Sequence, residues 1–424
     1  MVTNVKVTLW GADLGRVQWD EANQRVLFQY EPSFVSKGIE PAPLKMPCNS
    51  RVVYSFPELR NWTYNGLPGL LADSLPDAFG RELMEQWLKR QGRESANPIE
   101  RLCYQGKRSM GALEFEPVLN SELESESKIE VDSLVNIAAE ALSKKESLNT
   151  NISAKSQALL DIIKVGTSAG GQRAKAVIAL NDKTGEIKSG QINAPDGFEY
   201  WLLKLDGVSD GVLTGPKHYG ELEYSYYKIT QACGIDMMES RLYKENGRSH
   251  FLTKRFDRKN GMKIHTQTLC AMDHMDFQQR YAYSYEDAFR VMRSLHLPYS
   301  DAEELFRRMV FNVIGMNLDD HTKNITFILE KGGEWRLSPA YDMGYAYNPN
   351  GGWTAHHQMS INGKRDDVTR TDMMAVADAM HIKHAKKIID DIENVFRNFE
   401  KFMEPDIPEI MIDKIKENIK VDKI

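Results

Sequence analysis

The first part of the chain shows the alternation of apolar and polar positions that is typical of half-buried strands. Apolar side chains fall on every second position in the stretches 5–10 and 25–30, and the turn formers Gly11 and Gly15 lie between them. Side chains of a strand point alternately to opposite faces, so one face of such a strand can be buried. The pattern predicts a small antiparallel sheet between Val5 and Phe34.

After this predicted sheet, apolar residues recur at the spacing of a helix. Between residues 67 and 88, Pro76 suits a first helical turn, and apolar Phe79, Leu83 and Trp87 come at four-residue intervals. This spacing predicts an amphipathic helix that packs on the sheet. Helical patterns recur at 221–233, at 285–295 and from Asp301 onward, ending in a stripe of Ile388, Ile389, Ile392, Val395, Phe396 and Phe399.

Strand patterns occupy the middle of the chain, at 176–180, 200–206 and 251–257. They follow a segment, 119–160, that is rich in Ser, Glu, Lys and Asn. This segment holds one set of apolar residues at helical spacing, namely Leu134, Ile137, Ala138 and Leu142. A β-rich front half and a helical back half predict a two-lobed α+β enzyme.

Composition narrows the class of protein. The 424 residues are 42% hydrophobic, which indicates a globular chain with an ample core. Lys and Arg number 54 against 60 Asp and Glu, a formal net charge of −6. Proteins that bind nucleic acid usually carry a basic excess, so DNA binding by this chain alone is not expected.

The cysteines and the N-terminus indicate the compartment. Cys48, Cys103, Cys233 and Cys270 have no C-x-x-C spacing, so we expect buried thiols rather than a zinc site or disulfides. The N-terminus lacks a charged segment followed by an apolar one, and no apolar run reaches about 18 residues. We expect a cytoplasmic protein.

Residues 166–175 form the first candidate for chemistry, with three glycines and two hydroxyls directly before a strand. Glycines let successive backbone N–H groups turn toward one anion, so the loop suits a polyphosphate. It does not match G-x-x-x-x-G-K-[ST], and a glycine-rich stretch before a strand is more often a tight turn. The loop alone leaves both interpretations open.

The second candidate is the segment 317–324, which lies between a helical run and an apolar strand. Asp319 precedes Asn324 by five residues. In protein kinases this D-x-x-x-x-N spacing joins the aspartate that takes the hydroxyl proton to an asparagine that binds a metal ion. The alternative is a solvated turn in which His321 caps a local group.

Two further candidates fit the same scheme. Asp342 follows the hairpin expected at 325–338 and lies 23 residues after Asp319, where kinases place a magnesium ligand. Lys204 stands in an apolar strand and Glu223 on the next helix, like the kinase lysine that binds phosphates and the glutamate that holds it. The alternative for Lys204 is a strand-edge lysine whose ammonium reaches water.

Taken together, these features follow the order of a kinase, and the chain resembles the HipA family of bacterial kinase toxins over nearly its whole length. The motifs that carry the resemblance are VTLWGADLGRV, LLADSLPDAFGRELM and QGKRSMGALEFEP in the first part, and TSAGGQRAK, LLKLD, TKRFDR, LDDHTKNI and PAYDM in the rest. The resemblance implies an α+β, two-lobed protein-kinase-like fold with an added N-terminal β-rich module and a mostly helical C-terminal lobe. It implies four parts: the N-terminal module at 1–118, the polar connection at 119–160, the kinase N-lobe core at 161–256 and the helical C-lobe at 257–424.

The resemblance also implies roles for single residues. Asp319 and Lys204 are the catalytic pair, Asn324 and Asp342 bind magnesium, and Glu223 supports Lys204. The residues implied in ATP binding are Gly170, Gly171, Gln172, Arg173, Ala174, Lys175, Lys204, Lys254, Arg255, Phe256, His321, Thr322, Lys323, Asn324, Tyr341 and Asp342. Ser168 matches the serine whose autophosphorylation inactivates family members, with Thr167 as an alternative.

The partners implied are a small DNA-binding antitoxin of the HipB type and a protein substrate of the aminoacyl-tRNA synthetase class, with DNA bound only through the antitoxin. Two other functions fit the motifs. One is a small-molecule kinase of the aminoglycoside type, which would not need the first 115 residues. The other is a non-catalytic co-repressor that binds the antitoxin, against which the complete catalytic set argues.

Overall fold

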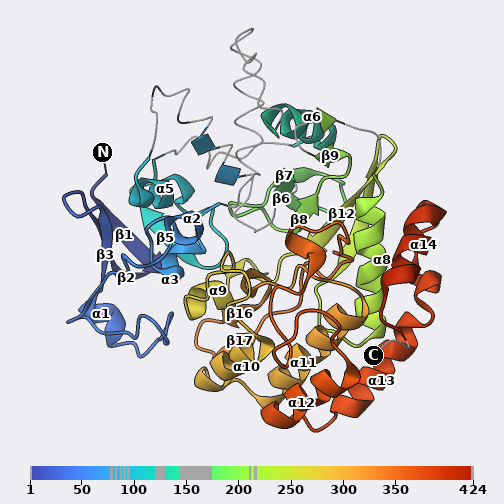
Figure 1. Ribbon diagram of the computed structural model, residues 1–424. Coiled ribbons are helices and arrows are strands. Elements are labelled where there is room, and N and C mark those ends of the chain that lie inside the picture. The colour runs from blue at the N-terminus through green and yellow to red at the C-terminus, as the bar shows by residue number, and fades with distance from the viewer. Residues whose placement is uncertain are drawn as a thin grey trace. The chain divides into compact units, whose positions relative to one another are not determined.

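The computed structural model describes residues 2–76, 96–119, 129–142, 174–209 and 217–421, together with positions 80, 81, 84, 85, 88, 92, 212 and 213. The chain forms two compact units (Figure 1). The first contains residues 1–220 and 241–266, and the second contains residues 221–240 and 267–424. The chain therefore passes between the units three times.

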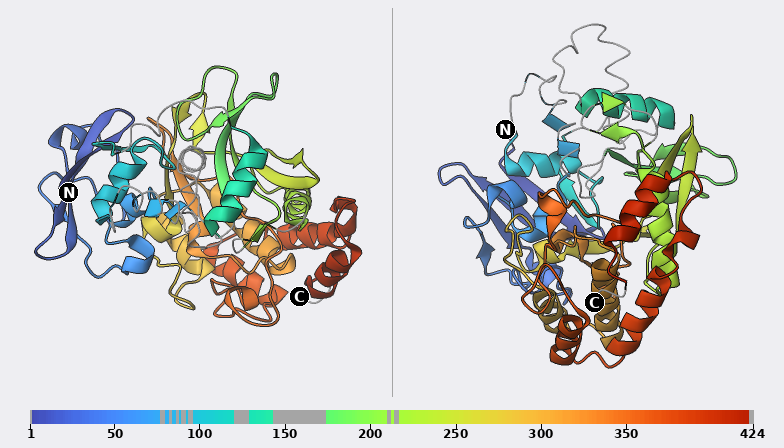
Figure 2. Two further views of the ribbon diagram at one scale, coloured as in Figure 1. Left: turned by 90° about the horizontal axis from the view of Figure 1, so that it is seen from above. Right: turned by 45° about the vertical axis from the view of Figure 1, so that its right-hand side comes forward.

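An antiparallel sheet opens the first unit, as predicted. Its strand order is β4-β3-β2-β1-β5, and Figure 2 shows β1–β3 side by side in blue. Trp10 and Gly11 join β1 to β2 with φ of 51° and 76°, which is the geometry of a two-residue hairpin turn. The strands are β1 (Asn4–Leu9), β2 (Ala12–Asp20), β3 (Arg25–Tyr30), β4 (Val53–Tyr54) and β5 (Leu113–Glu116).

Short helices accompany this sheet: α1 (Pro32–Val35), α2 (Asn61–Tyr64), α3 (Gly69–Ala72) and α5 (Pro98–Gln105). The prediction of one helix over 67–88 is wrong in its first part, because α3 ends at Ala72 and a turn precedes Pro76. Beyond Pro76 the described positions 80, 81, 84, 85 and 88 are helical, as predicted. Proline disfavours the helical conformation in the residue before it, so a helix cannot run smoothly through Leu75. The expected apolar positions Phe79, Leu83 and Trp87 lie outside the described residues.

A second five-stranded sheet, of order β11-β12-β8-β6-β7, completes the first unit. Its strands are β6 (Lys175–Leu180), β7 (Ile187–Ser189), β8 (Glu199–Lys204), β11 (Ser240–Glu245) and β12 (Arg248–Lys254). Helix α6 (Val131–Leu142) contributes Leu134 and Val135 to the core around Trp201. The strand predictions for this region and the helix in the polar segment are confirmed. Smaller pairs are β9 (Val208–Ser209) with β10 (Val212–Leu213), and β13 (Arg258–Lys259) with β14 (Met262–Lys263).

The second unit is mainly helical, as predicted. Its helices are α8 (Tyr219–Ala232), which begins at the boundary, α9 (Leu269–Met272), α10 (Tyr285–Ser294), α11 (Tyr299–Ile314), α12 (Arg370–Met380), α13 (Ala385–Phe396) and α14 (Glu409–Asn418). The hairpin of β16 (Thr326–Leu329) and β17 (Trp335–Leu337) is also confirmed. Short 3-10 helices are η2 (Thr322–Asn324), η3 (Trp353–Ala355) and η4 (Phe399–Phe402), and β15 (His265–Thr268) spans the unit boundary.

Aromatic side chains join the main helices of the second unit. Phe311 on α11 meets Phe396 on α13 with ring centroids 5.2 Å apart, and Tyr226 on α8 meets Phe311 at 6.2 Å. The Tyr226 hydroxyl donates to the carbonyl of Gly315 at 3.0 Å, which satisfies the polar end of a fully buried ring. The stripe predicted on α13 is confirmed, since Ile388, Ile389, Ile392 and Phe396 are buried.

All four cysteines are free thiols, and Cys103, Cys233 and Cys270 are buried as expected. Cys48 differs from that expectation, since it is only partly buried. None of the helices that the structure describes is long and apolar enough to cross a membrane. The four-part division of the chain stays a prediction.

Candidate active site

Helix α11 leads the chain into the predicted catalytic loop. The helix ends where the N–H of Gly315 donates to the carbonyl of Phe311 at 2.8 Å. A Cβ on Gly315 would lie 2.5 Å from the Phe396 ring and 2.9 Å from the Phe311 carbonyl oxygen, so a larger residue does not fit. Met316 follows with φ +57°, and this turn directs the chain into the loop.

Hydrogen bonds within the loop hold its two ends together. The side-chain amide of Asn324 donates to the backbone carbonyl of Asp319 at 2.7 Å, and the N–H of His321 donates to the same carbonyl at 2.9 Å. The hydroxyl of Thr322 donates to the carbonyl of Met275 at 2.6 Å, which fixes η2 to the segment after α9. The segment with the D-x-x-x-x-N spacing therefore forms a closed loop, in which Asp319 and Asn324 lie side by side.

The carboxylate of Asp319 lies at the surface of the loop and is 41% exposed. Its Oδ1 accepts a hydrogen bond from the indole N–H of Trp353 at 2.5 Å and lies 3.7 Å from Nε2 of His321. Partial burial raises the pKa of Asp319 above its ordinary value, although His321 and the bond from Trp353 oppose this rise. Burial lowers the pKa of His321, although the neighbouring charges of Asp319 and Asp342 oppose this fall.

The neighbouring carboxylate, that of Asp320, is buried and anchors the structure around the loop. Its Oδ2 accepts from the hydroxyl of Tyr285 at 2.9 Å and contacts Nδ1 of His357 at 2.7 Å. Its Oδ1 accepts from the backbone N–H of Gln358 at 2.7 Å. The three hydrogen bonds satisfy the buried carboxylate, and those from His357 and Gln358 tie the segment after Asp342 to the predicted catalytic loop.

Asp342 lies on a turn held from several sides. It adopts φ +53°, a left-handed conformation that Asp and Asn tolerate better than most residues. Its carbonyl accepts from the side-chain amide of Asn317 at 3.2 Å. The hydroxyl of the preceding Tyr341 donates to the carbonyl of Lys323 at 2.6 Å, so the turn is attached to the loop that carries Asn324.

A small pocket in the second unit brings the predicted metal ligands together. Its wall includes Asn324, Asp342, Asp320 and His321. Asn324 and Asp342 offer an amide oxygen and a carboxylate, which are ligands that magnesium accepts, with phosphate oxygens and water completing its coordination. The residues present thus fit a magnesium ion that is bound together with a nucleotide. Among the described residues, no group of three or more His, Cys, Asp or Glu side chains could hold a metal ion by itself.

The predicted phosphate lysine lies in the first unit, at the end of β8. This strand is the middle one of five, and Lys204 is its last residue. Both interpretations of Lys204, as a phosphate ligand and as a strand-edge lysine that reaches water, stay predictions. Lys204 pairs in register with Lys175 of β6, and its ammonium lies 5.7 Å from the centre of the Phe251 ring. Glu223 lies on α8 in the second unit, and its pairing with Lys204 stays a prediction.

The glycine-rich loop falls mostly outside the described residues. Thr167, Ser168, Gly170, Gly171, Gln172 and Arg173 are among those not described. The structure resumes at Ala174, whose carbonyl accepts from the N–H of Leu205 at 3.0 Å, and Lys175 begins β6 as a buried residue. The loop is therefore followed directly by a buried strand, as the sequence predicts.

Three of the residues implied in ATP binding, Lys254, Arg255 and Phe256, lie where β12 ends. Lys254 forms an ion pair with Glu199 and lies 5.8 Å from the centre of the Trp201 ring. The backbone N–H of Arg255 donates to the carbonyl of Tyr200 at 2.9 Å, which fixes the start of the segment, and Phe256 follows half-buried. The role of these residues in nucleotide binding stays a prediction.

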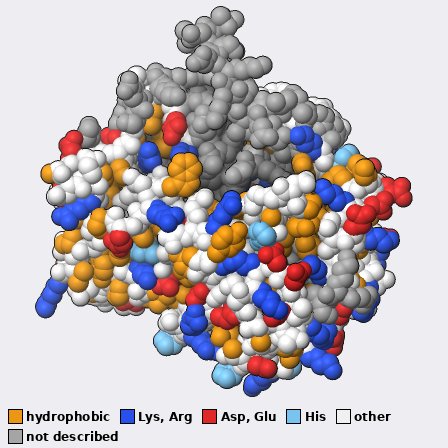
Figure 3. Space-filling model, in the orientation of Figure 1, with side chains coloured by type: hydrophobic (Ala, Val, Ile, Leu, Met, Phe, Trp, Pro, Cys, Tyr) orange, Lys and Arg blue, Asp and Glu red, His pale blue; other side chains and the backbone are white. Residues whose placement is uncertain are grey.

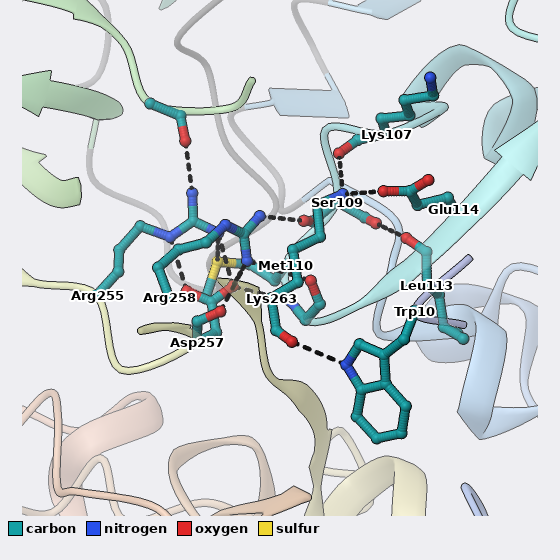
Figure 4. Close-up of polar contacts among 12 residues, drawn as sticks. Trp10, Lys107, Ser109, Met110, Leu113, Glu114, Arg255, Asp257, Arg258 and Lys263 are labelled. Carbon is teal, nitrogen blue, oxygen red and sulfur yellow. Dashed lines mark hydrogen bonds and ion pairs between the residues drawn. The ribbon is translucent and has the colours of Figure 1, made fainter. Parts of the chain in front are cut away.

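The Arg255 side chain takes part in a buried ion cluster that sequence reasoning missed (Figure 4). Asp257 accepts from Arg255 at 2.6 and 2.8 Å, from Arg258 at 2.7 Å and from the N–H of Gly111 at 2.9 Å. Burial opposes ionisation of Asp257, but the two guanidinium groups outweigh it and hold its pKa well below the usual range. Arg258 also reaches the carbonyl of Ser109 at 3.4 Å.

This cluster joins the two halves of the first unit. Ser109 and Gly111 precede β5 of the N-terminal sheet, whereas Arg255 and Arg258 follow β12 of the second sheet. Close by, the ammonium of Lys263 donates to Glu114 at 2.8 Å (Figure 4). The motifs QGKRSMGALEFEP and TKRFDR, which are far apart in the sequence, therefore meet through buried charges.

The folds of the units and the arrangement of the catalytic loop define a protein-kinase-like architecture with an added N-terminal sheet. The family models agree with this. The HipA N-terminal domain matches residues 5–116, and the HipA-like C-terminal domain matches residues 167–399, more than half of the chain. The chain belongs to the HipA family.

Two proteins to which this chain is similar share little sequence identity with it. The protein Y4mE of Sinorhizobium fredii is 26% identical over 133 residues, which are 29% of this chain and 31% of that protein. This chain thus matches about a third of the length of that relative. HipA of Shewanella oneidensis MR-1, solved in a complex with HipB and operator DNA, superposes with a TM-score of 0.68 at 15% identity and covers 97% of this chain and 94% of its own. The likeness shows a common fold.

Proposed function

We propose that this chain is a HipA-type serine/threonine protein kinase that transfers the γ-phosphate of ATP, with magnesium, to a hydroxyl of a protein. The observation that carries the proposal is the arrangement of the second unit, in which Asn324 and Asp342 line one pocket and the Asn324 amide holds the backbone of Asp319. Family membership supports it.

The residues of the chain have distinct parts in this reaction. ATP and magnesium supply, when bound, the phosphoryl group and the positive charge that balances it. Asp319 takes the proton of the acceptor hydroxyl while that oxygen bonds to the γ-phosphorus and the bond from the γ-phosphorus to ADP breaks. Asn324 and Asp342 hold the metal ion, and Lys204 binds phosphate oxygens.

We further propose that the acceptor is an aminoacyl-tRNA synthetase, as the resemblance to HipA toxins implies. The test is transfer of radiolabelled γ-phosphate from ATP to a panel of purified synthetases, with a parallel panel of sugars and aminoglycosides. Labelling of one synthetase on Ser or Thr supports the proposal. Labelling of an aminoglycoside in the absence of any labelled protein would support a small-molecule kinase instead.

The proposed partner is a HipB-like antitoxin, through which the chain would reach DNA. The Shewanella HipA is a member of such a complex. This chain has a net charge of −6, and on the face drawn in Figure 3 its basic and acidic side chains are interspersed. Because binding to DNA phosphates needs a basic surface, the purified chain should bind DNA poorly at physiological salt. A sub-micromolar affinity without a partner would contradict this.

Self-inactivation by phosphorylation of Ser168, or of the adjacent Thr167, is also proposed. A phosphate adds roughly −1.5 to −2 charge at pH 7 beside a site for a polyphosphate, and like charges repel. Mass spectrometry of the wild-type protein and of Asp319→Asn tests this. Phosphate on either residue in the first protein and on neither in the second supports it, and unmodified residues in a protein that phosphorylates its target refute it.

A further inference from the structure

The residue that contacts the carboxylate of Asp319 most closely comes from a distant segment. Trp353 lies 34 residues further along the chain, on η3, and its indole N–H donates to Oδ1 of Asp319 at 2.5 Å. Gly351 and Gly352 precede it with φ of 96° and 94°, a conformation that side chains rarely adopt. This glycine turn places the indole over the catalytic loop.

A chain of hydrogen bonds fixes the backbone of Trp353. The side-chain amide of Gln358 donates to the carbonyl of Trp353 at 2.5 Å and to that of His356 at 2.8 Å. The backbone N–H of Gln358 in turn donates to the buried carboxylate of Asp320 at 2.7 Å. Asp320 therefore holds, through Gln358, the residue that contacts its own neighbour Asp319.

Other side chains restrict the indole ring. Phe277 meets it edge to face at 6.1 Å between ring centroids, and the ring of His321 lies at 6.0 Å. The guanidinium of Arg280 lies 5.2 Å from the centre of the indole ring, within the range of a cation–π contact. Because the ring is packed by these groups and its backbone is bonded, the direction of its N–H is fixed.

We propose, in an inference that rests on the proposed function, that Trp353 is a positioning residue for phosphoryl transfer. Its indole N–H holds Oδ1 of Asp319 so that Oδ2 faces the acceptor hydroxyl. A carboxylate on a single Cβ can rotate about χ2, a broad torsion with little preference of its own. A hydrogen bond to one oxygen selects a single orientation of the other. Misplacement of a catalytic group by about 1 Å can cost on the order of a hundredfold in rate.

The kinetic test replaces Trp353 by Phe, which keeps an aromatic ring and removes the N–H. Trp62→Phe is the matched control, since Trp62 is 73% exposed on α2 of the N-terminal module. The assay measures release of γ-phosphate from Mg·ATP. We expect its kcat to be about ten- to a hundredfold lower in Trp353→Phe, the effect of losing one hydrogen bond to a charged group. The KM for ATP and the affinity for ADP should stay as in the wild type.

Three results would overturn the assignment of Trp353. The first is a kcat for Trp353→Phe equal to that of Trp62→Phe. The second is an increase in KM for ATP with kcat unchanged, which would place Trp353 in nucleotide binding. The third is a loss of kcat matched by loss of ADP binding and of the melting transition, which would show a purely structural role. If the wild-type protein transferred no phosphate from ATP to any synthetase of the panel or to itself, the proposed function would fail, and the positioning role with it.

An NMR measurement tests the hydrogen bond between Trp353 and Asp319 without any turnover of ATP. In the ¹⁵N-labelled protein the indole N–H resonance of Trp353, assigned by its absence from Trp353→Phe, should shift in Asp319→Ala because the acceptor is gone. In Gln358→Met, which loses the amide donor to the Trp353 carbonyl, the same resonance should shift and kcat should fall. A resonance unmoved by Asp319→Ala would show that the hydrogen bond does not form in solution.

Discussion

The side-chain amide of Asn324 donates a hydrogen bond to the backbone carbonyl of Asp319 at 2.7 Å. This bond occupies the nitrogen of the amide, so its oxygen is the atom with which Asn324 can bind a cation. The same contact fixes the distance between the proton acceptor and the metal ligand. The two proposed functions of the loop therefore depend on one another.

Asp319→Asn should lower the rate of phosphoryl transfer by about a hundredfold to ten-thousandfold, the range of general-base catalysis. The amide keeps the shape of the carboxylate and can still accept from Trp353, so the melting temperature and the affinity for ATP should change little. Turnover of Mg·ATP checks this. The matched control is Asp367→Asn, at a carboxylate that is 96% exposed. Equal turnover in the two variants would contradict the role of Asp319.

Asp342→Asn should weaken the binding of ATP only when magnesium is present. Asn tolerates the φ of +53° at this position, so the turn should survive while a charged metal ligand is lost. We expect the affinity for Mg·ATP to fall by more than about tenfold. Loss of a residue that only hydrogen-bonds to a metal ligand already costs about that much, and Asp342 is a proposed ligand itself. Calorimetric titration with and without magnesium measures this, and an unchanged affinity in magnesium would argue against the ligand role.

Asp257→Ala should destabilise the first unit by about 3–5 kcal/mol, because it leaves Arg255 and Arg258 buried beside no carboxylate. Asp182→Ala is the control. It removes the ion pair with Arg241, whose partner carboxylate is 52% exposed, and should cost no more than about 1 kcal/mol. Denaturation by urea gives both free energies of unfolding. Similar losses in the two variants would show that the buried cluster is not a major source of stability.

The buried His250 should make stability depend on pH. Its Nδ1 accepts from the N–H of Asp206 at 2.8 Å, and burial lowers its pKa to about 4. Unfolded histidine titrates near about 6.5, so between these values the unfolded chain holds a proton that the folded chain does not. The contribution of His250 is therefore complete above about pH 6.5 and is lost as the pH falls toward 4, at up to about 1.4 kcal/mol per pH unit.

The check is the slope of unfolding free energy against pH in His250→Asn, whose side-chain oxygen can replace Nδ1 as the acceptor. In this variant the slope between pH 4 and 6.5 should correspond to about one proton fewer taken up on unfolding than in the wild type. The same substitution at the exposed His296 should leave the slope unchanged. An identical slope in wild type and His250→Asn would mean that His250 titrates normally in the folded protein.

Much of the fold was readable from local patterns. The alternation after Val5 predicted the first sheet, and the spacing of Asp319, Asn324 and Asp342 predicted residues that the structure brings to one loop and one pocket. Such patterns are informative because the period of apolar residues and the spacing of polar ones reflect the geometry of a single strand, helix or loop. The 67–88 stretch shows their limit, since apolar spacing alone did not reveal the break before Pro76.

The remaining features depend on contacts between distant parts of the chain. Strand order placed Lys204 on a central strand, and no spacing within the sequence could show that. The contact of Trp353 with Asp319 needs a turn at Gly351 and the anchoring of Gln358, neither of which forms a periodic pattern. Asp257 and Gly111, 146 residues apart, likewise carry no local sign that they meet.

The triple passage of the chain between the units bears on how the protein is made. A nascent chain that has reached residue 220 has β8 but still lacks β12, the strand that covers one edge of β8. That edge stays open to wrong pairing until residues 241–266 have left the ribosome. A gene cut once between codons 220 and 267 cannot encode both units intact. The sequence of each unit is therefore interleaved with that of the other, and no single cut of the chain leaves both units whole.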